Sequence, residues 1–354
     1  MWIDADTHIF PKEVLDRVPR FKDGLSLFVD PSGKEWLKGP QGTMRHYGPI
    51  YYSMKIRLDS MRDAGFEKQV VLSQNFISLP MASLETSKAL CHAYNEELAK
   101  LASQYEEIIP IAEVPHQDPQ AAVEELEYAV KDLGLKGVRV LGSWNGKNLN
   151  SIDYLPFFEK LEELGVPLFV HHLSYLAKGI SNPINIARER VDRIGGSLAI
   201  GFMLEAIMAV SCLTLGGILE KFRGIKVVMN ESGASWVPGL MARLDHGFEM
   251  INKGIDKYGG TNMEGGFDKY QITRFPSDQI REHFVFCVDT AGDVQGVPFM
   301  VKDMGMEDNL ATQTDFPHPE GSNDMLRMLH ELDIPDGAKD KILGGNVGRL
   351  LHVN

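Results

Sequence analysis

Eight short apolar runs alternate with segments of helical periodicity along almost the whole chain. Because strand and helix units that alternate at this length form parallel strands, and eight such strands close into a cylinder, the pattern predicts an α/β fold of the (β/α)8 TIM-barrel type. A doubly wound open sheet is the competing architecture, but no Gly-rich phosphate-binding turn follows the first strand. The predicted strands lie at residues 2–10, 69–73, 108–112, 137–141, 167–171, 226–229, 283–288 and 310–314.

Two stretches interrupt this rhythm. Residues 11–54 are rich in Pro, Gly, Lys and aromatic side chains without a clean period, and we expect them to form an insertion that covers the mouth of a single domain of residues 1–354 as a lid. Residues 253–266 form a second, Gly-rich insertion. The apolar stretch near 199–222 contains Glu205 and several small residues, which favours a buried helix over a membrane span.

Composition limits the partners. The 354 residues are 44% hydrophobic and 24% charged, which suits a large core, and the formal net charge is -13. This charge disfavours nucleic acid and anionic membranes, which need clustered Lys and Arg, but not a small anionic substrate held by a metal. The three scattered cysteines indicate buried thiols in a reducing compartment, and with no signal peptide visible we expect a cytoplasmic protein.

The first predicted strand carries an unusual set of polar residues. Side chains of an extended strand alternate faces, so Asp4, Asp6 and His8 are expected to point the same way, with Ala5 and Thr7 opposite. A carboxylate and an imidazole two residues apart can bind one divalent ion, whereas the alternative is a polar edge strand or an N-cap.

Ligand-type residues recur where the other strands end. His171 closes the fifth strand, Glu231 follows the sixth, Asp289 the seventh and Asp315 the eighth. In barrels of this type the chemistry lies at the carboxyl ends of the strands. One such residue is commonly structural, but the repetition at several strand ends predicts a shared metal site.

The combined motifs resemble the amidohydrolase superfamily, in the amidohydrolase-2 group typified by aminocarboxymuconate semialdehyde decarboxylase and the aromatic-acid decarboxylases. The resemblance covers nearly the whole chain, and no single motif would carry it. The matching segments are Asp6-x-His8, His171, the run from Glu205 to Val228, the run from Gly233 to Asp245, Asp315-Phe316-Pro317-His318, and Ile342-Leu343-Gly344-Gly345-Asn346.

The resemblance implies a metal site of four ligands: Asp6, His8, His171 and Asp315. Relatives commonly have His at the position of Asp6, although a carboxylate also occurs there among the decarboxylases. Two-metal members carry a bridging lysine at the end of strand four, where this chain has residues 141–143 without one, so a single ion is expected.

The resemblance also assigns an acid/base role to a histidine at the end of strand six, and this chain lacks it. The aligned residues are Asn230-Glu231-Ser232-Gly233, and Glu231 is our candidate for that role or for a place behind the ligands. The alternative is a buried acid held by Arg243. Asp315 and His171 complete the predicted catalytic set.

Two carboxylates and two imidazoles suit zinc, manganese, iron or cobalt, and we expect zinc or manganese. The predicted reaction is decarboxylation of a small aromatic or unsaturated carboxylic acid, as in aromatic compound catabolism, with Asp315 or Glu231 as an acid of raised pKa that delivers the proton. The alternatives are a hydrolase that opens a ring, C–C or C–N bond with metal-activated water, and a metal-bearing binding protein without turnover. The resemblance further implies a homodimer.

Five further residues are candidates for contact with the substrate. Arg243 can bind a carboxylate bidentately, or instead pair with Glu231 or Asp245. Trp236 can stack on a ring or pack in the core, and His172 follows the ligand His171. The last two candidates, His318 and Ser322, lie on the loop past Asp315.

Overall fold

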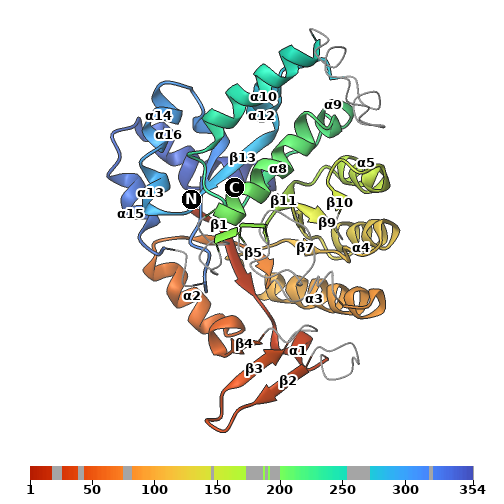
Figure 1. The fold of residues 1–354 in the computed structure, drawn as a ribbon. Helices are drawn as coiled ribbons and strands as arrows, with labels where there is room; N and C mark the ends of the chain where they lie inside the picture. Colours follow the sequence, from red (N-terminus) through yellow and green to blue (C-terminus); the bar gives the residue numbers. More distant parts are fainter. Residues whose placement is uncertain are drawn as a thin grey trace.

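The computed structural model describes residues 1–17, 26–38, 44–74, 82–144, 147–172, 186–187, 190–191, 200–252, 272–318 and 322–353. The predicted eight strands are present and parallel, and helices surround them (Figure 1). The third strand is interrupted at Ile111, which divides it into two short strands. The Ile111 N–H donates to the Val71 carbonyl at 3.1 Å and keeps the two parts in line. In chain order the strands are β1 (Ile3–Ile9), β5 (Lys68–Ser73), β6 and β7 (Ile108–Pro110 and Ala112–Glu113), β8 (Val138–Val140), β11 (Leu168–Val170), β12 (Val227–Met229), β13 (Phe284–Val288) and β14 (Leu310–Thr312).

The barrel closes between its first strand and the segment that follows its last. The His8 N–H donates to the Phe316 carbonyl at 2.7 Å, and the Asp315 N–H donates to the Asp6 carbonyl at 3.0 Å. These bonds join residues about 300 positions apart in the sequence and complete the cylinder. The (β/α)8 prediction is therefore confirmed.

Asp4 differs from the prediction, because its side chain does not point with Asp6 and His8. The register of β1 against β5 shifts between Asp4 and Thr7, so the strict alternation of faces fails there. Asp4 instead accepts hydrogen bonds from the Thr314 N–H at 2.9 Å and the Thr314 hydroxyl at 2.5 Å. It ties β1 to the segment after β14 and leaves Asp6 and His8 to face the site.

Local sequence signals set where the helices begin and end. The side chains of Ser53, Ser83 and Asp118 each accept a hydrogen bond from a backbone N–H three residues ahead, as N-cap residues do. Gly165 follows the last residue of the helix Leu155–Leu164 and ends it. Its φ of 65° is a left-handed conformation that glycine adopts without steric penalty. The helices are α2 (Met54–Asp63), α3 (Leu84–Gln104), α4 (Pro119–Lys131), α5 (Leu155–Leu164), α8 (Phe202–Thr214), α9 (Ile218–Lys221), α10 (Val237–Asn252), α12 (Pro276–His283), α13 (Ala291–Val294), α14 (Val297–Lys302), α15 (Met325–His330), α16 (Asp336–Asp340) and α17 (Asn346–Leu351), with short single turns at Ile152–Tyr154, Glu307–Asn309 and Lys341–Gly345.

The strands are buried on both faces. One core fills the barrel interior, and a larger core lies between the strands and the helices. Burial of both faces explains why the strands are short continuous apolar runs. The interior core includes Ile3, Ala5, Val70, Leu72, Ile109, Ile111, Phe169, Val228, Val285, Cys287 and Ala311.

One segment of the described residues, Phe202–Lys221, is long and apolar enough to cross a membrane by length and composition, with a mean hydropathy of 2.0. It comprises α8 and α9, and 61% of it is buried inside the molecule. The segment packs on the barrel in the outer layer of helices (Figure 1), as the sequence predicts for a core helix.

The insertion after β1 forms a small antiparallel sheet. It contains α1 (Lys12–Leu15), β2 (Ser26–Val29), β3 (Glu35–Lys38), β4 (Met44–Tyr47) and the turn Pro49–Tyr51. The Tyr47 hydroxyl donates to the Phe10 carbonyl at 2.8 Å, which anchors this sheet at the carboxyl end of β1. Figure 1 shows the sheet projecting from the barrel. Its function as a lid stays a prediction, as does the single-domain organisation, and the Gly-rich insertion at 253–266 lies outside the described residues.

Candidate metal centre

The four predicted ligands converge at the carboxyl ends of the strands. The Nε2 atom of His8 lies 3.4 Å from Asp6 Oδ1 and 3.2 Å from Asp315 Oδ1, and the Nε2 atom of His171 lies 3.5 Å from Asp6 Oδ2. One ligand atom from each of the four residues lies within 4.8 Å of all the others, and all four side chains are buried. We call these four residues the metal cluster.

The hydrogen bonds of the two imidazoles fix which nitrogen faces the cluster. His8 Nδ1 lies 3.0 Å from the Ser73 carbonyl, and His171 Nδ1 lies 2.8 Å from the His172 carbonyl. Because a carbonyl can only accept, each Nδ1 carries the hydrogen, and each Nε2 of a neutral ring presents a lone pair. Burial lowers the pKa of His8 to about 4 and that of His171 well below its usual value. Two neutral rings with converging lone pairs, their Nε2 atoms 3.0 Å apart, are arranged as metal ligands.

The carboxylates of the metal cluster have unused acceptor atoms. Both oxygens of Asp6 and the Oδ2 of Asp315 are buried and accept no hydrogen bond within the part of the chain that the structure describes. Burial, together with the charge of Asp315, raises the pKa of Asp6 well above its usual value. A divalent cation would supply the missing positive charge. The residues therefore fit one ion of borderline hardness, such as manganese or zinc.

A buried ion pair supports His8 from behind. The Arg139 guanidinium on β8 lies 3.0 Å from Glu113 Oε2 and 3.3 Å from the Ser73 hydroxyl, which itself donates to Glu113. The carbonyl of the same Ser73 accepts the Nδ1–H of His8. The pair thus holds in place the residue that orients a predicted ligand.

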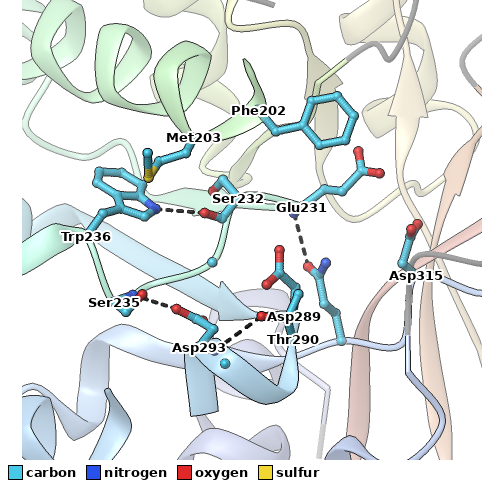
Figure 2. A pocket seen from close by; sticks show the side chains of 13 residues that line it. Phe202, Met203, Glu231, Ser232, Ser235, Trp236, Asp289, Thr290, Asp293 and Asp315 are labelled. Carbon is cyan, nitrogen blue, oxygen red and sulfur yellow. Dashed lines mark hydrogen bonds between the residues drawn. The ribbon is translucent and has the colours of Figure 1, made fainter. Parts of the chain in front are cut away.

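Glu231 and Asp315 adopt backbone conformations that are rare for such residues, with φ of 51° and 58°. Left-handed backbones of this kind are costly for residues other than glycine and concentrate at functional sites. Glu231 Oε2 lies 3.4 Å from His171 Nε2, and the Glu231 N–H donates to Gln313 Oε1 at 3.3 Å. Both acids point toward the same cavity (Figure 2).

That cavity has a volume of about 240 Å³ and lies beside the metal cluster. It combines aromatic and apolar side chains with four acids. The sequence predicted only Glu231, Trp236 and Asp315 as functional among its residues, and it marked Asp289 by its strand-end position. The lining residues are Phe202, Met203, Glu231, Ser232, Gly233, Ser235, Trp236, Asp289, Thr290, Gly292, Asp293, Gln313 and Asp315.

His318 lies beside the metal cluster, and one atom each of Glu231, Asp315 and His318 lies within 4.8 Å of the others. Its Nδ1 is 2.8 Å from Asp315 Oδ1, its Nε2 is 3.1 Å from Gln74 Oε1, and its ring stacks on His8 with centroids 4.6 Å apart. Burial pushes the pKa of Asp315 upward, but the charge and hydrogen bond of His318 outweigh burial, and the pKa of Asp315 is lowered to about 2. The expectation of a raised pKa is therefore not met at Asp315, and His318 orients this carboxylate.

Trp236 lines the cavity directly, whereas His172 packs against Phe202, one of the residues that line it. The Trp236 indole lines the cavity, donates to the Ser232 carbonyl at 2.7 Å and meets Phe286 edge-on at 5.6 Å. His172 is buried and stacks on Phe202 at 5.9 Å, so it reaches the cavity wall only through that ring.

Arg243 and Ser322 are not brought to the cavity, and the structure gives their predicted substrate contacts no support. Met241, Leu244 and Phe248 form the buried stripe of α10, and Arg243 falls on its exposed side. The Ser322 hydroxyl accepts a hydrogen bond from the backbone of Asp324 at 3.2 Å, a local turn contact. Both residues follow a strand in the sequence. The phase of the helix directs Arg243 to the surface, and the turn engages Ser322 locally, so neither lies in the described lining of the cavity.

Comparison with known proteins identifies the family of the chain. The family model for amidohydrolases matches residues 3–264. The 2-amino-3-carboxymuconate-6-semialdehyde decarboxylase of Dictyostelium discoideum is 24% identical, over 99% of this chain and 92% of that protein.

Two solved structures share the fold. The 5-carboxyvanillate decarboxylase of Sphingomonas paucimobilis has a TM-score of 0.77 at 18% identity, covering 100% of this chain and 99% of that chain. The dihydroxybenzoic acid decarboxylase of Polaromonas sp. JS666, solved with bound manganese and the inhibitor 2-nitroresorcinol, has a TM-score of 0.70 at 19% identity, covering 99% of this chain and 96% of that chain. With the family model matching well over half of its length, the chain belongs to the amidohydrolase family.

Proposed function

We propose that the protein is a metal-dependent, non-oxidative decarboxylase of a small aromatic or unsaturated carboxylic acid. The observation that carries the proposal is the cavity beside the metal cluster, which is lined by Glu231 and Asp315 and has the rings of Phe202 and Trp236 in its walls. Its volume of about 240 Å³ exceeds the roughly 150 Å³ that accommodates benzene, so one substituted ring fits. The decarboxylase relatives support this reading over others.

In this proposal Asp6, His8, His171 and Asp315 hold the ion. When bound, the cation supplies positive charge that attracts the substrate carboxylate and stabilises the negative charge that develops as the reaction proceeds. We propose manganese or zinc, and manganese is bound to the related Polaromonas enzyme.

Glu231 is the proposed proton donor. It lies at the border between the metal cluster and the cavity, 3.4 Å from His171 Nε2, where the missing strand-six histidine is expected. Glu231 delivers a proton to the carbon that carries the carboxylate. The bond between the two carbons then breaks, carbon dioxide leaves, and the proton takes its place. Asp315, whose Oδ1 is hydrogen-bonded to His318, serves as a ligand in this scheme.

The experiment measures carbon dioxide release by the manganese-loaded protein from a panel of hydroxybenzoates that includes 2,6-dihydroxybenzoate, in D2O. We expect one deuterium in the product at the carbon that carried the carboxylate. Glu231→Gln should lower turnover by about 100-fold or more, the scale of general acid catalysis, with metal content unchanged. Asp303→Asn, an exposed acid, serves as the control.

Incorporation of solvent oxygen into the product, without carbon dioxide, would instead indicate the hydrolase. Metal binding without any turnover across the panel and across hydrolysable analogues would indicate a binding protein. The proposed homodimer and the proposed cytoplasmic location are tested separately, by sedimentation and by fractionation of the cells that produce the protein.

A further inference from the structure

Asp289 is an acid of the cavity that the metal cluster does not use. It follows β13, and its carboxylate points into the cavity between Glu231 and Asp293 (Figure 2). Burial, with the nearby charges of Asp293 and Asp315, raises the pKa of Asp289 to about 7. An acid in such surroundings gains most from a neighbour that donates a hydrogen bond.

The adjacent Asp293 is already engaged in the fold. Its Oδ1 accepts the backbone N–H groups of Ala234 at 3.0 Å and Ser235 at 2.7 Å, and its Oδ2 lies 2.9 Å from the same Ala234 nitrogen. These contacts fix the turn that leads into α10. The Asp289 carboxylate also interacts with the backbone N–H of Gly233, but a carboxylate has further acceptor positions, and those of Asp289 are available to a ligand in the cavity.

The cavity wall has a strongly one-sided charge. Glu231, Asp289, Asp293 and Asp315 contribute to it, whereas no Lys or Arg occurs among the described residues that line it. Asp315 has a buried oxygen, Oδ2, that accepts no hydrogen bond from those residues. Once the cation has drawn in one substrate carboxylate, the rest of the wall favours hydrogen-bond donors and repels a second anion.

We propose that Asp289 determines substrate specificity: it accepts a hydrogen bond from a hydroxyl or amino substituent on the ring, and it excludes dicarboxylates. This inference rests on the proposed function for the orientation of the substrate, with its single carboxylate toward the metal cluster. The substrate class is thus a monocarboxylic acid that carries a hydrogen-bond donor on the part of the ring that faces Asp289.

The test uses matched series of 2-hydroxybenzoates that differ in one substituent. At ring position 4 the members are 2,4-dihydroxybenzoate, 2-hydroxy-4-methoxybenzoate and 2-hydroxyterephthalate, and a second series carries the same three groups at position 5. Dissociation constants are measured by calorimetry for the manganese-loaded wild type, Asp289→Ala, Asp289→Asn and the exposed control Asp303→Asn. Carbon dioxide release is measured in parallel.

At a pH above the Asp289 pKa of about 7, where its carboxylate is charged, the wild type should in at least one series bind the hydroxyl member about tenfold more tightly than the methoxy and carboxylate members, as expected for a hydrogen bond to a charged group. Asp289→Ala should bring the hydroxyl and methoxy members within about twofold of each other and tighten binding of the dicarboxylate about tenfold. Asp289→Asn keeps the shape of the side chain and replaces Asp289→Ala in the test if that variant does not fold. It should also improve dicarboxylate binding. Asp303→Asn should match the wild type.

The inference is overturned if the Asp289 variants keep the wild-type ranking, if the wild type prefers the dicarboxylate, or if it binds no member of either series. Its failure is separable from failure of the proposed function. Selective binding that depends on Asp289, without carbon dioxide release, would refute decarboxylation and support the specificity role. Carbon dioxide release with an unchanged ranking of ligands in the variants would support decarboxylation and refute the specificity role of Asp289.

Discussion

Glu231 and Asp315 reach the site from backbones that glycine would adopt more easily. A left-handed residue other than glycine costs on the order of 1 to 3 kcal/mol, and two such residues flank one cavity here. These conformations direct the Asp315 carboxylate into the metal cluster and the Glu231 carboxylate to its border. Stability is thus given up at the positions where the proposed chemistry takes place.

At Glu231 this trade-off can be measured with a matched pair of variants. Glu231→Gly and Glu231→Ala both remove the carboxylate, but only glycine relieves the strained backbone. We expect Glu231→Gly to unfold in urea with a free energy about 1 kcal/mol higher than that of Glu231→Ala, with turnover lost in both. Equal stability of the two variants would show that the backbone at this position is unstrained.

The pKa of Asp289 predicts how stability depends on pH. Its folded pKa of about 7 exceeds the unfolded value of about 4, so the protonated form is preferred in the folded protein. Its contribution to the free energy of unfolding is fully present below pH 4 and is lost as the pH rises to 7.

Asp289→Asn does not titrate, so its stability relative to the wild type should increase between pH 4 and 7 and stay level outside that window. The total change is at most about 4 kcal/mol. Denaturant titrations of both proteins with a chelator present measure it, and a difference that does not vary with pH would show that Asp289 ionises normally.

At the scale of secondary structure, a buried ion pair links strands beneath the site. Arg139 on β8 and Glu113 on β7 are fully buried and bind each other and Ser73 of β5. Removing one partner of such a pair leaves a buried charge uncompensated, whereas removing both does not.

Arg139→Met should therefore lower the free energy of unfolding by about 3 to 5 kcal/mol, and the double variant Arg139→Met/Glu113→Gln should recover most of that loss. Because Ser73 orients His8, the single variant should also bind manganese more weakly. Additive effects of the two substitutions in a double-mutant cycle would argue against the coupling.

The sequence predicted the strands well, because each depends on local order, whereas the four residues of the metal cluster were assigned from the family resemblance together with their positions at strand ends. A short apolar run defines each buried strand, and residues at strand ends meet at one rim by topology. Asp4 was assigned to the wrong face because a shift in register cannot be read from alternation alone. Arg243 lies on the exposed side of α10 and outside the described lining of the cavity, because the phase of this helix depends on its packing. Phe202 and Gln313 join the cavity through contacts between distant segments, and neither carries a local signal.

At the scale of the whole molecule, the metal should stabilise the fold. A ligand at a concentration 1,000 times its dissociation constant adds about 4 kcal/mol to the free energy of unfolding. We expect EDTA to lower the melting temperature and manganese to restore it, with one ion bound per chain by elemental analysis. Asp315→Asn should respond weakly to either treatment, and an equal response in wild type and variant would place the ion elsewhere.

The closure of the barrel has a consequence for biosynthesis. Two of the predicted ligands lie on the first strand, at positions 6 and 8, and one lies in the segment after the last, at position 315. A ribosome has therefore made all the strands of the barrel before the coordination sphere can assemble. A nascent chain, or one truncated before position 315, lacks the full set of donors, so capture of the ion would report that synthesis has passed the final strand.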